Sequence, residues 1–365
     1  MKISTVISSA LFLSAALSGC MTEEPPTPVD TNLYTDMPRV STVNGYVIDP
    51  EAFFALSAQW PVDPEDPEGP PPPMLFNGMP YFELSSVSGA NVYLASGTHQ
   101  TERSATNERG VWQVFNVPTT ETDAYLMHTE PLASGVHLGA GVPFPSPVEL
   151  PESHYVATTT LRPIVPSVPL CQYQVATLVS DTGALAALAN ARTSAGTPTT
   201  VDDLLNPGKT GGVVLAWVYA PSFLADWFQF PADSIAAEPS MGQLYSLDWA
   251  PPGVGGPDQS PMGYIASEGG VSPLGYYAVV LPPGASGELT VQFADTTPEG
   301  GEPGPFGPRP YFIPPLSAPI QPGVSMARVF SFPGGDEEEP PPTSTDDEEM
   351  PPSPSEDFGV FCFPR

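Results

Sequence analysis

Short runs in which apolar and polar side chains alternate recur along most of this chain, and glycine, proline or asparagine separates them. The clearest run is 288–294, where Leu289, Val291 and Phe293 alternate with polar neighbours. That period of two is typical of a strand with one buried face. Together with segments rich in β-branched and aromatic residues, the pattern predicts strands at 40–48, 91–95, 111–117, 124–128, 154–161, 213–219, 243–249, 275–281, 288–294 and 324–332.

One region, 175–205, departs from this pattern. Residues 184–192 have the composition of a short helix with Asp181 as its candidate cap, and residues 200–203 resemble a capping box that opens a second helical turn. The predicted fold class is therefore mainly β, with two antiparallel β-sandwich domains, a short helical linker and disordered tails. The expected order is a signal peptide at 1–19, a Pro/acid-rich tether at 20–39, a first sandwich at 40–165 with a Pro-rich insertion at 53–84, the linker at 166–210, a second sandwich at 211–332, and an acidic tail at 333–365 that ends in an apolar segment.

Three pieces of the first block occur in a familiar order. Gly45-Tyr-Val-Ile-Asp49 is followed by Ser88-Gly-Ala-Asn-Val-Tyr-Leu94 and then by Ala105-Thr-Asn-Glu-Arg-Gly-Val-Trp-Gln-Val-Phe-Asn-Val-Pro118. This order resembles the carboxypeptidase regulatory-like domain, a transthyretin-like sandwich, over roughly residues 40–163. The resemblance implies a noncatalytic accessory module with a transthyretin-like or immunoglobulin-like fold. Residues 275–293 repeat the later half of the pattern, which indicates a second, divergent copy.

The first twenty residues form a separate unit. Lys2 precedes an apolar stretch at 3–17, and Leu17-Ser-Gly-Cys20 closes it. The segment resembles the lipobox of bacterial lipoprotein precursors, which implies acylation of the Cys20 thiol and cleavage before it; an ordinary secretory peptide is the alternative. Met21 stands where an aspartate would favour the inner membrane, so we expect a lipid anchor in the outer membrane, on the periplasmic or the cell-surface side.

Composition narrows the possible partners. The chain has 51 prolines, 33 glycines and a formal net charge of −31. A chain this acidic repels phosphate, so we expect no nucleic-acid partner. The charge fits a device for solubility, and cation capture is the alternative. The acidic runs at 336–339 and 346–349 lack the ligand spacing of a calcium loop, so we predict no metal site.

The cysteines predict one disulfide. If Cys20 is acylated, Cys171 and Cys362 are the two that remain in an oxidising compartment. Their bond would close a loop of roughly 190 residues, for which the chain-entropy model gives roughly 5 kcal/mol as an upper figure. Two free buried thiols are the alternative.

No catalytic motif stands out, and the histidines at 99, 128, 137 and 154 lack the spacing of a metal site. We therefore predict no enzymatic activity and no cofactor. Trp112 and Trp217 fit core packing, whereas Trp60 and Trp227 lie in loop-like contexts and are the candidate ligand-binding residues. The expected function is that of a non-enzymatic cell-envelope lipoprotein, a surface structural, adhesion or assembly module with an envelope protein or glycan partner. The alternatives are a glycan- or nutrient-binding lipoprotein of an uptake system and an accessory subunit of a secreted hydrolase.

Overall fold

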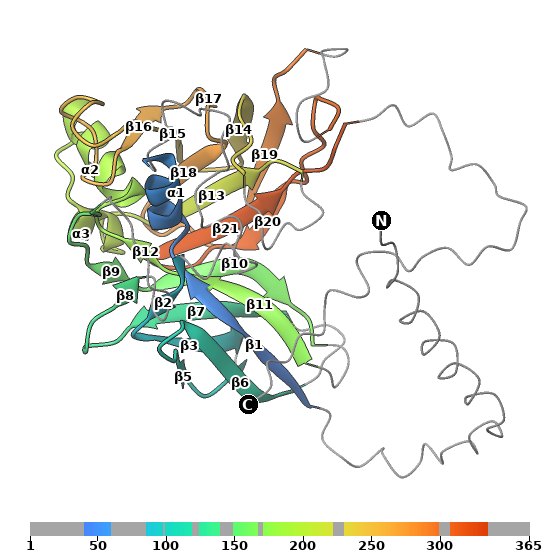
Figure 1. The fold of residues 1–365 in the computed structure, drawn as a ribbon. Coiled ribbons are helices and arrows are strands. Elements are labelled where there is room, and N and C mark those ends of the chain that lie inside the picture. The colour runs from blue at the N-terminus through green and yellow to red at the C-terminus, as the bar shows by residue number, and fades with distance from the viewer. Residues whose placement is uncertain are drawn as a thin grey trace, which may run out of the picture. The chain divides into compact units, whose positions relative to one another are not determined.

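The computed structural model describes residues 40–59, 85–97, 99–118, 124–138, 149–166, 171–221, 230–298 and 307–334 (Figure 1). All of them belong to one compact unit. The predictions for the signal peptide, the tether and the acidic tail lie outside the described residues. Below, the N-terminal half means residues 40–180 and the C-terminal half means 181–334.

A ten-stranded central sheet runs through both halves (Figure 1). Its order is β16-β15-β18-β13-β21-β10-β7-β3-β4, with β5 paired to β3. The halves join where β10 and β21 pair in parallel, with Thr158 opposite Val324. The strands are β16 (Tyr264–Glu268), β15 (Gln243–Trp249), β18 (Tyr276–Leu281), β13 (Gly212–Tyr219), β21 (Val324–Phe330), β10 (Thr158–Ile164), β7 (Tyr125–Pro131), β3 (Ala90–Ser96), β4 (His99–Gln100) and β5 (Ser104–Ala105).

Strand β13 lies near the middle of this sheet and is buried along its whole length. Val214, Ala216 and Val218 pack in one core cluster, and Leu215 and Trp217 pack in another. Because successive side chains point to opposite faces of a strand, the central sheet is covered on both faces here. This coverage explains why the sequence of β13 is an unbroken apolar run rather than an alternation.

A three-stranded sheet, ordered β11-β1-β6, covers the N-terminal half of the central sheet on one face. Val43 and Trp112 from this sheet share a core cluster with Val92 and Met127 from the central sheet. We call this face the helix face, because the helices lie on it in the C-terminal half. The strands are β1 (Val40–Ile48), β6 (Val111–Pro118) and β11 (Cys171–Thr177), with β1 parallel to β11.

The opposite face, here called the β19 face, is covered in the C-terminal half by a four-stranded sheet ordered β17-β14-β19-β20. Leu289 and Val291 of β19 pack against Val214 and Tyr277 of the central sheet. The alternation read from the sequence of β19 is therefore that of a strand with one face toward the core. The strands are β14 (Ile235–Pro239), β17 (Val271–Ser272), β19 (Glu288–Asp295) and β20 (Leu316–Pro319).

Three helices cover the helix face in the C-terminal half. Ala52 of α1 and Leu185 and Leu188 of α2 share a core cluster with Trp217 and Tyr276. Helix α1 thus comes from the N-terminal half but packs on the C-terminal half. The helices are α1 (Pro50–Ala58), α2 (Ala184–Ser194) and α3 (Val201–Leu205), and two short ladders pair β2 (Val87–Ser88) with β8 (His137–Leu138) and β9 (Tyr155–Val156) with β12 (Val179–Ser180).

The predicted mainly β fold class is confirmed. The capping box at Thr200 and Asp203 is also confirmed, since both of its hydrogen bonds are present. The prediction that Asp181 caps α2 is wrong: Gly183 is the N-cap, and the Asp181 carboxylate accepts the His154 N–H instead, at 2.8 Å. The predicted domain boundaries stay a prediction, although β11 falls in the expected linker and α1 overlaps the expected insertion.

Candidate functional site at the junction of the two halves

A polar pocket of about 250 Å³ lies where the two halves meet. Its wall from the N-terminal half includes Tyr93, His128 and Glu130, and its wall from the C-terminal half includes Gln321. Leu126, two residues before His128, packs under the β19 sheet, so His128 and its partner strand residue Tyr93 lie on the β19 face as well. The pocket therefore lies beside the edge of the β19 sheet.

Three flat groups stack along this face. Tyr93 and His128 are direct cross-strand partners, and their rings lie 5.0 Å apart at an interplanar angle of 12°. The Arg103 guanidinium lies over the Tyr93 ring at 4.5 Å from its centroid. Cross-strand neighbours of this kind stabilise a sheet face, so part of this arrangement is explained by folding alone.

Glu130 holds the Arg103 guanidinium of this stack. Its carboxylate accepts two hydrogen bonds from Arg103, at 3.1 Å to Nε and 3.3 Å to Nη2. The hydrogen bond from Arg103 lowers the pKa of Glu130. Glu130 is therefore an anion at neutral pH, and its charge is matched within the site by Arg103.

His128 is the one histidine of the described residues that lines this pocket. Its Nδ1 lies 3.0 Å from the Thr159 hydroxyl, and burial lowers the pKa of its ring. A histidine with a lowered pKa is neutral at neutral pH, so the pocket presents an imidazole, a hydroxyl and an amide. Such groups suit hydrogen bonds to a small hydroxyl-bearing ligand.

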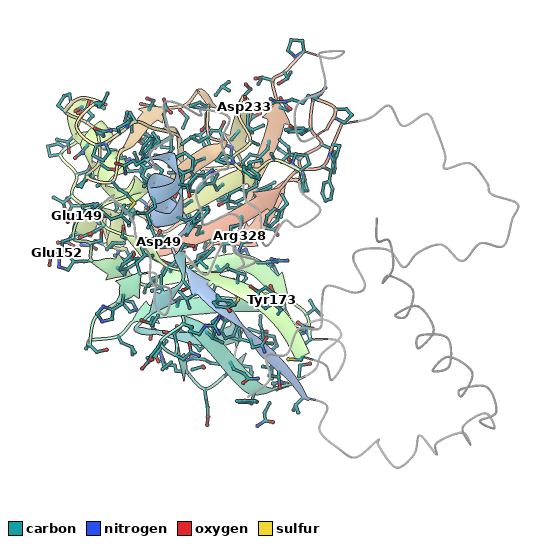
Figure 2. All side chains as sticks on the ribbon, in the orientation of Figure 1. Asp49, Glu149, Glu152, Tyr173, Asp233 and Arg328 are labelled. Carbon is teal, nitrogen blue, oxygen red and sulfur yellow. The ribbon has the colours of Figure 1, made fainter. Side chains whose placement is uncertain are left out.

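On the helix face of the same junction lies a second cluster, built on two buried carboxyl groups. Figure 2 shows Asp49 at the base of α1, where β1 ends. Its carboxylate caps the helix by accepting the Ala52 N–H at 2.9 Å, and it accepts the Tyr155 hydroxyl at 2.8 Å. Asp49 is fully buried, so these partners replace the water that a carboxylate would otherwise bind.

Glu51 connects three elements from one buried position. Its carboxyl group accepts the Ala184 N–H at the start of α2, at 3.2 Å, and the hydroxyl of Tyr276 from β18. Its backbone carbonyl accepts the Tyr264 hydroxyl at 2.8 Å. Gly183 makes the approach possible, because a Cβ there would lie 1.8 Å from Glu51 Oε2.

Burial raises the pKa of both acids. The pKa of Glu51 rises to about 8, through burial first and the charge of Asp49 second. Burial raises the pKa of Asp49 to about 6, against the effect of its hydrogen bonds. Sequence reasoning missed this cluster, and its one local signal was Asp49-Pro50, an N-cap residue followed by proline at the first helical position.

The structure tests few of the residues singled out from the sequence. Cys171 begins β11 and is disulfide-bonded. Cys362 and Cys20 lie outside the described residues, so the bond between Cys171 and Cys362 and the acylation of Cys20 stay predictions. Trp60 and Trp227 also lie outside them, and their proposed role is untested. Trp112 and Trp217 are each 1% exposed, which confirms their assignment to the core.

Within the described part of the chain, no three histidine, cysteine, aspartate or glutamate side chains are placed to hold a metal ion. Its helices include none of the length and apolarity that crossing a membrane requires.

No family model matches the chain, and no curated protein matches it. Among solved structures it is similar to the shaft pilin SpaA from Lactobacillus rhamnosus GG, with 10% sequence identity and a TM-score of 0.20, over 82% of this chain and 99% of the pilin. A mutant of the same pilin gives the same values. A TM-score of 0.20 carries no argument about function, so the proposals below depend on the described residues and the sequence.

Proposed function

We propose that this protein is a non-enzymatic cell-envelope lipoprotein, anchored in the outer membrane through Cys20, that serves as a structural, adhesion or assembly module. The observation that carries the proposal is the continuity of the central sheet across both halves. A module that displays a surface or joins an assembly has to hold its parts in a fixed relation.

Two features support such rigidity. Strand β21 pairs with β10 of the N-terminal half and, over seven register positions, with β13 of the C-terminal half. Helix α1 then crosses from the N-terminal half into the core of the C-terminal half, where Phe54 packs 5.5 Å from Trp217. Domains joined by a linker alone move relative to one another by default, whereas backbone ladders and a shared core oppose such motion.

The anchor is tested by the Cys20→Ser variant, with Ser9→Ala as the matched control that leaves the thiol in place. The serine variant should remain unprocessed or become soluble, because acylation and cleavage both depend on the thiol. Membrane fractionation and intact-mass analysis give the readout. A serine variant that still sediments with the outer membrane as a processed species would overturn the proposed anchor.

Rigidity is tested by native-state hydrogen exchange in increasing urea. The amides of β7 and β13, which belong to different halves of the central sheet, should converge on one free energy of opening, because a shared sheet unfolds as a unit. Two limiting values that differ by more than about 1.4 kcal/mol, a factor of ten in the opening constant, would show that the halves open separately and would refute the proposed rigid module.

The pocket beside His128 favours a second candidate, the binding of a small glycan or nutrient. At about 250 Å³ the pocket lies just below the ~300 Å³ at which ligand pockets usually begin, so one sugar ring is the largest fit. This limit is why we rank binding second. Titration with single sugars should give a saturable signal that His128→Ala removes and that exposed His137→Ala retains; equal signals in the two variants would reject this site.

A further inference from the structure

A second and larger pocket lies at one end of the central sheet in the C-terminal half. Its volume is about 540 Å³, which is within the range of small-molecule sites. Val280, Pro282 and Pro283 form an apolar part of its wall. Two basic side chains, Arg192 and Lys209, line the same pocket, in a chain with 10 lysines and arginines against 41 acidic residues.

Arg192 lies in the last turn of α2 and is partly buried. Its Nη1 donates to Gln243 Oε1 at 2.8 Å and to the Tyr245 hydroxyl at 3.5 Å, and its Nε donates to Thr199 Oγ1 at 3.4 Å. All of these acceptors are neutral. Within the described residues Arg192 therefore has no carboxylate partner, and Nη2 makes no hydrogen bond.

Other basic side chains of the described body behave differently. Arg103 pairs with Glu130, Arg309 pairs with Asp233 and Asp295, and Lys209 pairs with Asp203 at 2.5 Å. A guanidinium held in place by neutral groups keeps its charge unpaired, and the two N–H groups of Nη2 remain available to donate to an anion. Charge-assisted hydrogen bonds of this kind to a carboxylate or phosphate are stronger than hydrogen bonds between neutral groups.

The rest of the pocket limits the ligand further. Lys209 adds a second donor whose charge is partly matched by Asp203, and its side chain is 58% exposed. Glu268 also lines the pocket, and its carboxylate repels a ligand with several negative charges. The apolar wall at Val280 and Pro282 suits a hydrocarbon stem. Together these features favour one oxyanion group on an apolar stem.

We propose that this pocket binds a small organic monoanion, with its carboxylate or phosphate group on Arg192 and its apolar stem against Val280 and Pro282. This inference goes beyond the proposed function, because it holds whether or not Cys20 is acylated. It assigns a ligand class to a site that the sequence did not indicate, since the residues come from five separated segments.

The test uses the full-length protein and three probes of one stem length: hexanoate, hexyl phosphate and hexylamine. Binding measured by calorimetry or NMR should be saturable for hexanoate or hexyl phosphate and absent for hexylamine. The two anions separate carboxylate from phosphate recognition. Binding of hexylamine as tight as that of both anions would overturn the proposal.

Variants locate the site. Arg192→Gln should weaken anion binding about tenfold or more. Arg192→Lys should recover part of the binding, because lysine restores the positive charge but not the planar guanidinium group. Arg109→Gln, at an exposed turn in the N-terminal half, is the matched control for loss of one positive charge. Unchanged binding in Arg192→Gln would reject the site.

One measurement on the unmodified protein guards against a variant that fails to fold. Phenylglyoxal modifies arginine side chains, and the rate at each arginine can be followed by peptide mass spectrometry. Bound hexanoate or hexyl phosphate should slow modification of Arg192 several-fold and leave that of Arg109 unchanged. Equal rates at Arg192 with and without saturating anion would contradict binding there.

Discussion

Replacing Glu51 by glutamine should remove one component of the pH dependence of stability. Glu51 is fully buried, and burial raises its pKa from 4.5 to about 8. The folded protein therefore holds a proton that the unfolded chain releases above pH ~4.5. This contribution to stability is fully present below that pH and is lost as the pH rises towards about 8.

The size of the effect follows from the difference between the two values. A change from 4.5 to about 8 corresponds to roughly 5 kcal/mol at about 1.4 kcal/mol per pH unit. Asp49 contributes a loss of the same sign, but its pKa of about 6 ends that loss at lower pH. The interval from about pH 6 to about pH 8 therefore reports mainly on Glu51, and the expected loss there is about 3 kcal/mol.

Glu51→Gln keeps the shape of the side chain and an oxygen that accepts from Tyr276 and Ala184. Its free energy of unfolding should stay nearly constant from about pH 6 to about pH 8, while that of the natural protein falls by about 3 kcal/mol. Urea unfolding at half-unit steps of pH gives the measurement.

The matched control is Glu288→Gln, which replaces a glutamate carboxyl group by an amide at an exposed position at the start of β19. It should follow the natural protein through the whole pH range. If Glu51→Gln loses stability between pH 6 and pH 8 in parallel with Glu288→Gln, the raised pKa of Glu51 is refuted.

Two further predictions concern charge and the disulfide. Because the chain carries a net charge of −31, added NaCl should raise the midpoint of thermal unfolding by screening self-repulsion, and an equal midpoint at low and molar salt would contradict this. Nonreducing peptide mapping should recover Cys171, which is disulfide-bonded, in one peptide with Cys362, so that cleavage within 334–357 releases no C-terminal fragment before reductant is added. Recovery of Cys171 linked to a second chain or to Cys20 would refute that pairing.

The sequence predicted those elements whose pattern is local. The alternation in 288–294 corresponds to β19 (Glu288–Asp295), and the apolar run at 213–219 corresponds to β13 (Gly212–Tyr219). Burial of one face imposes the alternation in β19, and burial of both faces imposes the apolar run in β13, so the residues themselves display each pattern. The Thr200 capping box was predictable for the same reason, since its partners are three residues apart.

The elements that were missed depend on distant partners. Helix α1 contains good helix formers, but at nine residues it is too short to be stable on its own. Its stability comes from the packing of Phe54 against Trp217 and Tyr264. Asp181 was a reasonable cap on local grounds, but Glu51, more than a hundred residues earlier, takes that role at the Ala184 N–H. No local pattern indicates such a contact.

Both pockets were unpredictable for a related reason. Sequence reasoning placed the candidate ligand contacts at Trp60 and Trp227, because exposed aromatic side chains in loops are a local signal. The described pockets instead combine strand ends and turns, such as His128 with Gln321 and Arg192 with Gln243. In the first pocket their proximity follows from the parallel pairing of β10 with β21. In the second it follows from the antiparallel pairing of β15 with β18 and from the packing of α2 on the sheet.

The place of β21 in the sheet has a consequence for how the chain folds as it emerges with its N-terminus first. Among the described residues β21 (Val324–Phe330) is the last strand in sequence, yet it lies between β13 and β10. Until it arrives, each of those strands has an open edge on which another chain could pair. The middle of the sheet thus forms last, through contacts of long sequence separation, which are slow to form. A chain cut short before residue 324 should leave two partial sheets prone to aggregation, so the interval between the emergence of β10 and that of β21 is when this protein most needs a chaperone.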